Sequence, residues 1–467
     1  MIRRAAVLVA LAGLAAACGE AGRDRAAPAV HRLDGQTTPV TRTPPRPRRV
    51  LVSVLDGDLR RYVRGARVTL GRLSDRTNRH GVAVLTVRRR TSSLVTVRAR
   101  GYAPTTRRLP FGRRPFWRVR IYQPRLQWPI YGATPTRTQA QTRIRLRPPF
   151  RIVWSRGLGS LVEFPAVVSD GVAYVGNFYG TVRALSMRTG KLVWRHDTPH
   201  GKMAASPAVV GDTVVAHGMD GHVWVLDRAN GRLLWHYDVG SPVESSPIVR
   251  HGVDYFGAWN GNVYALDLRR RRLRWLHRDG YKITSSVAVA GRTLFVGDYG
   301  GRLLALDARS GRLRWSGSVN GRVYGTPAVA HGRVFVPSSD GDSLTAFSAR
   351  GRYLWRINTG SYVYSSPATW GGRVFFGSYN GVFYAASAST GRVLWEVGTG
   401  GPISGAAVVV DGVAYAGSFA HRIVGVDARS GRVLLRFPHG HYVPVSGNGQ
   451  RLLLHGYSRL YAVEPRR

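Results

Sequence analysis

Cations, tyrosines and one glutamate recur at two fixed places ahead of a proline-containing motif, which reads Ser-Ser-Pro or a variant, as in Ser245-Ser246-Pro247. Five residues before that proline, or before its equivalent, stand Lys202, Lys282, Arg322, Tyr362 and Tyr442. Three residues before it stand Glu244, Tyr324 and Tyr364. Tyrosine and arginine are favoured at protein interfaces, and tyrosine faces beside cations also suit sugars or acidic polymers. We expect these eight residues to form a binding rim. The competing interpretation is that they are solvated loop residues.

The sequence contains no recognisable catalytic motif. The histidines show no spacing typical of zinc ligands, and no Gly-x-Ser-x-Gly, Walker or dinucleotide-binding pattern stands in a suitable context. Carboxylates do recur, but each ends an apolar run before a glycine turn, which is the place of a turn cap. These carboxylates are Asp227, Asp267, Asp307 and Asp427. We therefore expect no catalytic residue, no metal site and a function in binding.

The N-terminus has the features of an export signal. A positive segment at 2–4 precedes an apolar run of 13 residues at 5–17, too short to span a bilayer. Cys18, the only cysteine of the chain, follows the small residues Ala15-Ala16-Ala17, and the site resembles a bacterial lipobox. We expect a lipoprotein-type signal peptide at 1–18 with lipid on Cys18, and hence a membrane-anchored protein of the cell envelope, in the periplasm or on the extracellular face. The alternative is ordinary signal cleavage at the same site.

Three further segments precede the second half of the chain. Residues 19–49 contain Pro, Arg, Ala and Thr, and predict a disordered tether. Residues 50–122 contain short apolar strands separated by turn residues. Residues 123–149 carry five prolines and read as a second, basic linker.

The strand-rich segment 50–122 is similar to the carboxypeptidase-regulatory-like and PEGA β-sandwich domains. The similarity rests on Gly65-Ala66-x-Val68, on Thr77-Asn78-x-x-Gly81 and on Ala99-Arg100-Gly101-Tyr102. Such domains are non-catalytic spacers or binding modules. Asp56 and Asp58 could suggest a metal, but carboxylates that form turns are the expected reading.

From residue 150 the sequence repeats itself every 40 or 41 residues. The marker is a tryptophan that ends a short strand, at Trp154, Trp194, Trp235, Trp275, Trp315, Trp355 and Trp395. Each unit has four short apolar runs separated by turns, which is one blade of a β-propeller. The last unit lacks its fourth strand, and 150–155 is a fourth strand without a unit before it. We therefore expect an all-β chain in which a small β-sandwich precedes an eight-bladed propeller at 150–467, closed by strand 150–155.

The repeat, with its Ala-Leu-Asp-x-x-Thr/Ser-Gly-x-x-x-Trp pattern, resembles the PQQ-like propeller repeats of quinoprotein alcohol dehydrogenases and of BamB, the propeller lipoprotein of outer-membrane assembly. The resemblance implies that the seven tryptophans pack between blades. The related dehydrogenases stack pyrroloquinoline quinone between a tryptophan and a disulfide of adjacent cysteines, beside calcium. Cys18 is the only cysteine here, and no calcium-binding set surrounds the non-repeat tryptophans Trp224, Trp259 and Trp370. We expect no cofactor, and we regard quinone-dependent dehydrogenation as less favoured than the two binding functions described next.

Charge narrows the choice of partner. The net charge is +44, of which residues 1–149 hold +26 with 32 arginines against 6 acidic residues. Such a surface attracts polyanions, and for an exported protein these are acidic wall polymers or anionic lipids, with nucleic acid out of reach. We expect a scaffold that binds an envelope protein, in outer-membrane or wall assembly. The alternative is a protein that binds carbohydrate or an anionic wall polymer.

Overall fold

The computed structural model describes residues 47–87, 94–108, 116–199 and 201–466. Cys18, the signal peptide and nearly all of the tether lie outside these ranges. The described residues form one short 3-10 helix, η1 (Pro124–Leu126), and otherwise strands and turns, so the all-β fold class is confirmed. None of the helical structure in these ranges has the length and apolar character needed to cross a bilayer.

Two sheets facing one core form the segment after residue 47. One sheet has the order β4-β1-β7 and the other β3-β2-β5-β6. The strands are β1 (Arg48–Asp56), β2 (Arg67–Leu70), β3 (Leu73–Arg76), β4 (Val82–Val87), β5 (Leu94–Arg98), β6 (Thr105–Arg108) and β7 (Phe116–Ile121). Alternate residues of β1, β2 and β5, such as Val52, Val68 and Val97, are fully buried between the sheets, as the period of two in a strand requires.

The carboxylate that ends β1, Asp56, and the one that follows it, Asp58, form a buried polar junction. Asp56 Oδ1 accepts the backbone N–H of Asp58, which is the turn expected from the sequence. Asp58 accepts hydrogen bonds from the backbone N–H of Gln123 and from the side-chain amide of Gln127. Burial nevertheless raises the pKa of Asp58 to about 7. Gln127 also accepts the backbone N–H of Asp170, so it joins the sandwich turn to the first blade.

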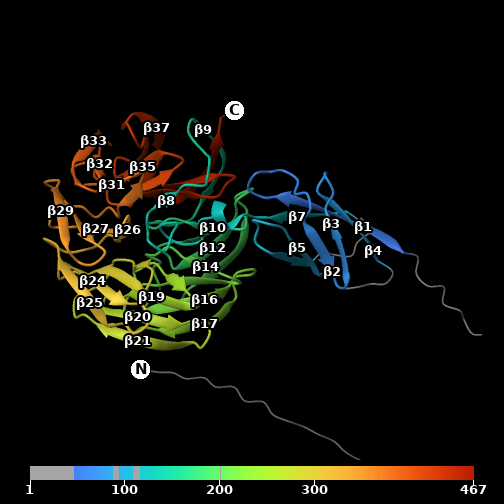
Figure 1. The fold of residues 1–467 in the computed structure, drawn as a ribbon, viewed down its shortest axis with the longest axis horizontal. Helices are drawn as coiled ribbons and strands as arrows, with labels where there is room; N and C mark the ends of the chain where they lie inside the picture. Colours follow the sequence, from blue (N-terminus) through green and yellow to red (C-terminus); the bar gives the residue numbers. More distant parts are fainter. Residues whose placement is uncertain (1–46, 88–93, 109–115, 200, 467) are drawn as a thin grey trace, which may run out of the picture. The chain divides into compact units, whose positions relative to one another are not determined.

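Eight sheets, antiparallel apart from one parallel pair in the seventh, make up the propeller, and Figure 1 shows them one after another around a ring. We call them blades 1 to 8, numbered from residue 167. Blades 1 to 4 are β10 (Val167–Ser169), β11 (Val172–Gly176), β12 (Thr181–Ser186), β13 (Leu192–Asp197); β14 (Ala208–Val210), β15 (Thr213–His217), β16 (His222–Asp227), β17 (Leu233–Asp238); β18 (Ile248–Arg250), β19 (Val253–Gly257), β20 (Asn262–Asp267), β21 (Arg272–Arg278); and β22 (Ala288–Ala290), β23 (Thr293–Gly297), β24 (Arg302–Asp307), β25 (Leu313–Ser318).

Blades 5 to 8 repeat this arrangement with two additions. They are β26 (Ala328–Ala330), β27 (Arg333–Ser338), β28 (Ser343–Ser348), β29 (Tyr353–Asn358); β30 (Ala368–Trp370), β31 (Arg373–Gly377), β32 (Val382–Ser387), β33 (Val393–Gly398); β34 (Val408–Val410), β35 (Val413–Ser418), β36 (Arg422–Asp427), β37 (Val433–Pro438); and β38 (Gly440–Gly447), β39 (Leu452–Gly456), β40 (Arg459–Pro465), β9 (Phe150–Gly157). Blade 7 gains a fifth strand, β8 (Ala140–Gln141), and blade 8 takes its fourth strand from β9.

The repeat tryptophans and the glycines of the Thr/Ser-Gly turn meet between neighbouring blades. A Cβ added at Gly311 would lie 2.5 Å from the ring of Trp275, and one at Gly231 equally close to Trp194. These glycines also have positive φ, which other residues adopt only with strain. The indole Nε1 of Trp275 donates to the carbonyl of Ala308 in the next blade. The repeat tryptophan of one blade therefore packs directly on the turn glycine of the next blade.

Hydroxyls link the innermost strands into a chain of hydrogen bonds. The backbone N–H of Ser206 donates to Ser246 Oγ at 3.0 Å, and that of Ser246 donates to Ser286 Oγ at 2.8 Å. The series continues through Thr326 to Ser366. Each bond spans 40 residues, so the Ser-Ser-Pro motif and its variants join blades 2 to 6, each to the next.

The segment expected as a basic linker is largely buried within the propeller. Its backbone carbonyls accept hydrogen bonds from the middle residue of six innermost strands. The carbonyl and N–H pairs are Trp128 with Val168, Pro129 with Val209, Pro135 with Val289, Thr136 with Val329, Thr138 with Thr369 and Gln139 with Val409. Arg137 is fully buried, and its guanidinium donates to the carbonyls of Tyr131, Ser246, Pro247 and Val287. We call residues 128–141 the central segment. It is basic, but it packs across the inner strands of the ring.

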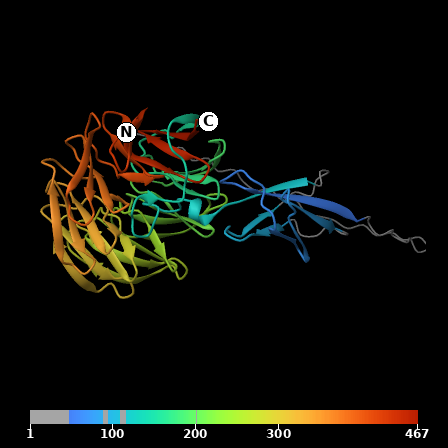
Figure 2. The same ribbon diagram turned by 45° about the horizontal axis from the view of Figure 1, so that its top comes forward.

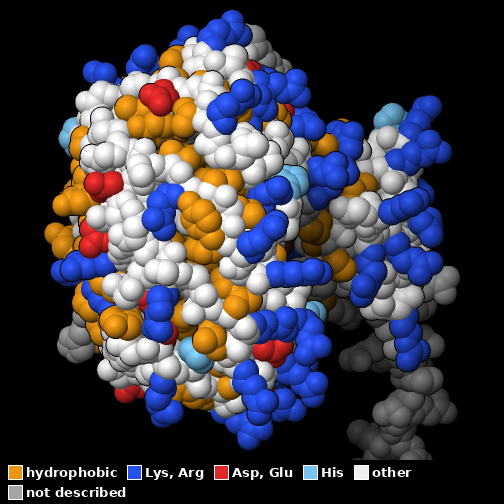
Figure 3. Space-filling view, turned by 60° about the vertical axis from the view of Figure 1, so that its left-hand side comes forward, with side chains coloured by type: hydrophobic (Ala, Val, Ile, Leu, Met, Phe, Trp, Pro, Cys, Tyr) orange, Lys and Arg blue, Asp and Glu red, His pale blue; other side chains and the backbone are white. Residues whose placement is uncertain are grey.

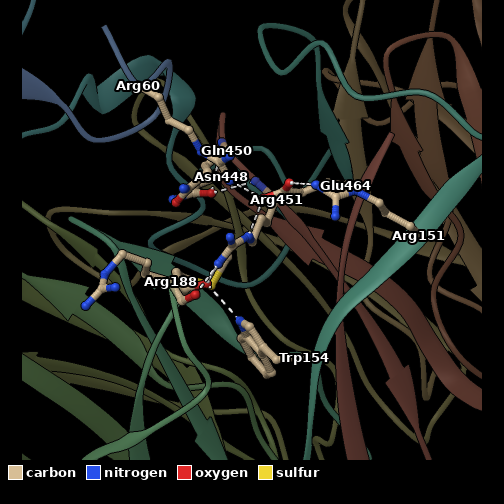
Figure 4. A network of polar contacts seen from close by, with 9 residues as sticks. Arg60, Arg151, Trp154, Arg188, Asn448, Gln450, Arg451 and Glu464 are labelled. Atoms are coloured by element: carbon tan, nitrogen blue, oxygen red, sulfur yellow. Dashed lines mark hydrogen bonds and ion pairs between the residues drawn. The ribbon is translucent and has the colours of Figure 1, made fainter. Parts of the chain in front are cut away.

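A polar network joins the first and last strands of the propeller (Figure 4). Arg451 Nε donates to Glu464 Oε1 at 2.6 Å, and its Nη1 donates to the carbonyl of Met187 in blade 1. Trp154 of β9 donates to the same carbonyl at 2.9 Å. Arg60 and Arg151 also pair with Glu464. In Figures 1 and 2 the teal start of the propeller lies beside its red end.

Candidate functional site

The loops before the innermost strands form the rim, and backbone hydrogen bonds hold them there. In blades 2 to 7 a residue one or two places after the second strand donates its N–H to the carbonyl of a rim residue. Tyr299 donates to Lys282 at 2.9 Å, and Tyr379 donates to Tyr362 at 2.9 Å. The same bond recurs from Met219 to Lys202, from Trp259 to Pro242, from Ser339 to Arg322 and from Phe419 to Pro402. The rim residues thus occupy equivalent, ordered positions.

The cations of the rim lie over aromatic rings. Lys282 Nζ is 3.3 Å from the ring centre of Trp259 and 5.0 Å from that of Tyr299. Arg322 lies 5.9 Å from the same Tyr299 ring, and Lys202 lies 5.8 Å from the Phe178 ring. Burial lowers the pKa of Lys282, and the neighbouring Arg322 acts in the same direction.

The tyrosines continue around the rim as a contiguous aromatic arc. Ring centres of Tyr324 and Tyr364 are 5.4 Å apart, and those of Tyr364 and Tyr379 are 5.0 Å apart. Tyr362 packs against both Tyr364 and Tyr379. The arc then passes from Tyr379 through Phe419 to Tyr442. All four predicted rim tyrosines therefore belong to one surface: Tyr324, Tyr362, Tyr364 and Tyr442.

A pair of glutamates lies below the arc. Tyr324 Oη contacts both Glu163 Oε1, at 3.1 Å, and Glu244 Oε1, so it bridges blades 1, 3 and 5. Glu244 Oε2 accepts the indole N–H of Trp259. Burial, together with the charge of Glu244, raises the pKa of Glu163 to about 7. One hydroxyl proton cannot serve two carboxylates, so a proton held on Glu163 satisfies the second contact.

Sequence reasoning missed Glu163 and the ring aromatics for different reasons. Glu163 stands at the position of Glu244, but its unit reads Phe164-Pro165-Ala166 and lacks the serine of the motif. The second position was available as a signal, because it recurs every 40 or 41 residues and is aromatic in five of seven units. The aromatic members are Phe178, Trp259, Tyr299, Tyr379 and Phe419, and the other two are Met219 and Ser339.

The cavity beneath the rim does not fit a quinone cofactor. It measures about 30 Å³ and is lined by Tyr131, Glu163, Tyr324 and Tyr442, among others. That is room for one or two water molecules, far less than a tricyclic quinone needs. The central segment supplies Tyr131, which donates to Ser366 Oγ and so belongs to the structure of the ring. Within the described ranges, His, Cys, Asp and Glu form no group of three or more suited to a metal.

One histidine–carboxylate pair resembles a catalytic dyad but is sealed. His217 Nε2 lies 2.9 Å from Asp254 Oδ2, and its Nδ1 lies 2.6 Å from the carbonyl of Ser245. Both side chains have zero exposure, so no substrate can reach them. The rim itself brings aromatic faces and cations together, an arrangement that suits recognition of a partner.

Comparison with known proteins finds similarity across the propeller. A sequence profile described as "Outer membrane protein assembly factor BamB" matches residues 147–278, 260–363 and 343–465. The outer membrane protein assembly factor BamB of Bordetella pertussis is 29% identical over 97 residues, which cover 21% of this chain and 25% of that protein. The quinoprotein alcohol dehydrogenase PedE of Pseudomonas putida is 36% identical over 80 residues, 17% of this chain and 13% of that enzyme. The aligned stretches thus span a quarter or less of these relatives.

Solved structures show the same fold. BamB from Moraxella catarrhalis superposes with a TM-score of 0.57 at 18% identity, covering 68% of this chain and 99% of that one. Quinohemoprotein alcohol dehydrogenase from Comamonas testosteroni superposes with a TM-score of 0.63 at 14% identity, covering 73% and 81%. Both an assembly factor and an enzyme share the architecture, so the fold does not by itself decide the function.

Proposed function

The chain belongs to the family described as outer membrane protein assembly factor BamB, and from that premise we propose that it is a non-catalytic scaffold of the cell envelope that binds a protein partner through its rim. In this proposal Cys18 anchors the protein to a membrane. The rim holds a segment of an envelope protein that carries acidic side chains, in outer-membrane or wall assembly.

The observation that carries this proposal is the aromatic arc beside the rim cations. Tyrosine, tryptophan and arginine supply most of the binding energy at protein interfaces. Several large side chains at this end of the blades are solvent-exposed: Tyr179 at 75%, Tyr281 at 52%, Tyr457 at 50% and Tyr362 at 47%. Lys202, Lys282 and Arg322 add positive charge beside them, which complements a partner with acidic residues.

Charge reversal of the rim tests the proposal. The triple variant Lys202→Glu, Lys282→Glu, Arg322→Glu should lose cross-linked partners that the wild-type protein retains in membranes. The matched control reverses Arg232, Arg312 and Arg392, exposed arginines at the opposite ends of blades 2, 4 and 6. Partner recovery that is equal in the rim triple and in the wild type would exclude the rim as the binding site.

A second candidate function, the binding of an anionic polymer, is favoured by a row of arginines on the β-sandwich. Arg67 stands opposite Arg76 on one neighbouring strand and opposite Arg98 on the other, and all three are exposed. Like charges directly opposite on adjacent strands destabilise a sheet, whereas a bound polyanion would neutralise them. Figure 3 shows Lys and Arg far outnumbering acidic side chains on one face of the molecule.

Retention on immobilised poly(glycerol phosphate) would test this second function. Replacing Arg67, Arg76 and Arg98 by Gln should lower the salt concentration at which the protein elutes, because fewer counterions are exchanged. Replacing Arg312, Arg392 and Arg432 by Gln removes equal charge from the propeller and serves as the control. If both triples elute alike, net charge alone explains the retention and the row is not a site.

A further inference from the structure

A pocket of about 360 Å³ lies where the chain leaves the central segment, at the end of β34 opposite the rim. One wall is Gln141, the last residue of the central segment, with Thr142, Arg145 and Arg147, which follow it along the chain. The other wall consists of Trp370 of blade 6 and of Val409, Asp411, Gly412, Asp427 and Arg429 of blade 7. The volume lies in the usual range of small-ligand sites.

Trp370 is an exception within the repeat. It is the third residue of the innermost strand of blade 6, and the equivalent residues are Ser169, Val210, Arg250, Ala290, Ala330 and Val410. Blade packing therefore does not require a tryptophan at this position. Arg429 lies 5.9 Å from the centre of the Trp370 ring. An aromatic ring with a guanidinium beside it thus lines a pocket that is open to solvent.

The charged groups of the pocket are organised by ion pairs. Arg145 Nη1 lies 3.2 Å from Asp411 Oδ1, and Arg147 Nη2 lies 3.3 Å from Asp427 Oδ2. Arg145 also donates to the carbonyl of Thr142. Each guanidinium has five N–H donors, so each retains donors beyond these contacts. With Arg429 the pocket holds three cations against two carboxylates, a net charge of +1, which favours an anionic ligand.

Asp427 is ionised at neutral pH. Burial disfavours its charge, but hydrogen bonds from the backbone N–H groups of Ser430 and Arg429, and from Arg147, hold its pKa below the ordinary value. Ionised carboxylates accept hydrogen bonds from hydroxyl groups, and arginine donates to a carboxylate in a planar, two-point geometry. The face of a tryptophan suits the apolar face of a sugar ring.

From this juxtaposition we propose that the pocket binds an acidic saccharide, with a sugar ring on Trp370, its carboxylate on Arg429 and the neighbouring arginines, and its hydroxyls on Asp411 and Asp427. This site goes beyond the proposed scaffold role and is independent of the rim. It also differs from the arginine row of the β-sandwich, since it recognises one or a few sugar units by shape.

Calorimetric titration of the full chain with tri-galacturonic acid tests the proposal. The wild-type protein should bind the acidic trisaccharide and should not bind neutral cellotriose. Trp370→Ala and Arg429→Gln should each weaken binding about tenfold or more, as loss of a stacking surface or of a charge-assisted hydrogen bond does. Arg429 is exposed, so its variant tests the site without loss of a core contact.

Blade 3 offers a matched control. Its equivalent cleft of about 350 Å³ is lined by His251, Asp267, Arg269, Arg270 and Arg274, and has no tryptophan. Arg269→Gln should leave the affinity for the trisaccharide unchanged, as should the rim triple variant. The proposal is overturned if the wild type does not bind the trisaccharide at millimolar concentration, if cellotriose binds equally well, or if Trp370→Ala and Arg429→Gln bind as the wild type does.

Discussion

Arg137 Nε donates a hydrogen bond of 2.9 Å to the carbonyl oxygen of Val287, 150 residues further along the chain. The same guanidinium serves carbonyls of blade 3 and of the central segment itself. Burial lowers the pKa of Arg137 to about 10, so it remains charged at neutral pH. One buried side chain thus donates hydrogen bonds to four backbone carbonyls and fixes the central segment within the ring.

Arg137→Ala should therefore destabilise the propeller by about 3–5 kcal/mol, because it leaves buried carbonyls unpaired and a cavity in their midst. Urea unfolding followed by tryptophan fluorescence measures the change. Arg143→Ala, an exposed arginine shortly after the central segment, should change the stability by less than about 0.5 kcal/mol. A similar small change for Arg137→Ala would show that the central segment does not hold the ring together.

Closure of the ring through β9 gives a second prediction. Deletion of 150–155 removes most of the strand that pairs with β40, and it also removes Trp154 from the network around Arg451. The melting temperature should fall sharply, since blade 8 then has an open edge. An unchanged melting temperature would contradict closure by this strand.

Single substitutions separate the contribution of the tryptophan from that of the strand. Trp154→Ala and Trp275→Ala should each cost about 3–5 kcal/mol, as loss of a large packed aromatic does. Trp259→Ala is the control, because this indole lies at the rim and does not pack on the turn of a neighbouring blade. Equal losses for all three would mean that the repeat position has no special role between blades.

The carboxyl of Glu163 makes stability depend on pH. Its pKa is raised from 4.5 to about 7 in the folded protein, so the folded state binds the proton more tightly than the unfolded state. Its contribution is fully present below about pH 4.5 and is lost as the pH rises through 7. From pH 5 to pH 8 the wild type should therefore lose about 1–3 kcal/mol of unfolding free energy relative to Glu163→Gln, which has no titrating group at this position. Urea titrations at the two pH values measure this, with the exposed Glu396→Gln as the control; a shift that is equal in both variants would assign the effect elsewhere.

The repeat could be predicted from the sequence because its determinants are local and periodic. The 40-residue spacing of Trp154, Trp194 and their successors specifies a blade, and the four apolar runs of each unit correspond closely to its strands. The all-β fold and the family follow from that pattern. In the sandwich the expected strands correspond to β1, β2, β4 and β5. Strands β3 and β6 are mostly polar, and in β7 two arginines interrupt the apolar residues, so none of the three was predicted.

The central segment could not be predicted, because its structure depends on partners 40 to 270 residues away. Its threonines, prolines and arginines have the composition of a linker, and nothing local distinguishes the buried Arg137 from the exposed Arg143. The candidate site was predicted in part. The rim residues share a register, which the sequence displays, but the bridge from Tyr324 to Glu163 and Glu244 crosses the ring and appears only once the ring is closed.

Site-specific photo-cross-linking in cells tests the central claim, that the rim is the surface on which a protein partner docks. A photoreactive amino acid would replace Tyr362 at the rim or Leu313 on an outermost strand, side chains that are 47% and 48% exposed. Their equal exposure makes Leu313 a matched control for accidental encounters. We expect a discrete protein adduct from position 362 that is absent from position 313 and that disappears when Lys202, Lys282 and Arg322 are reversed in charge. The same adducts from both positions, or adducts from position 313 alone, would contradict the rim as the docking surface.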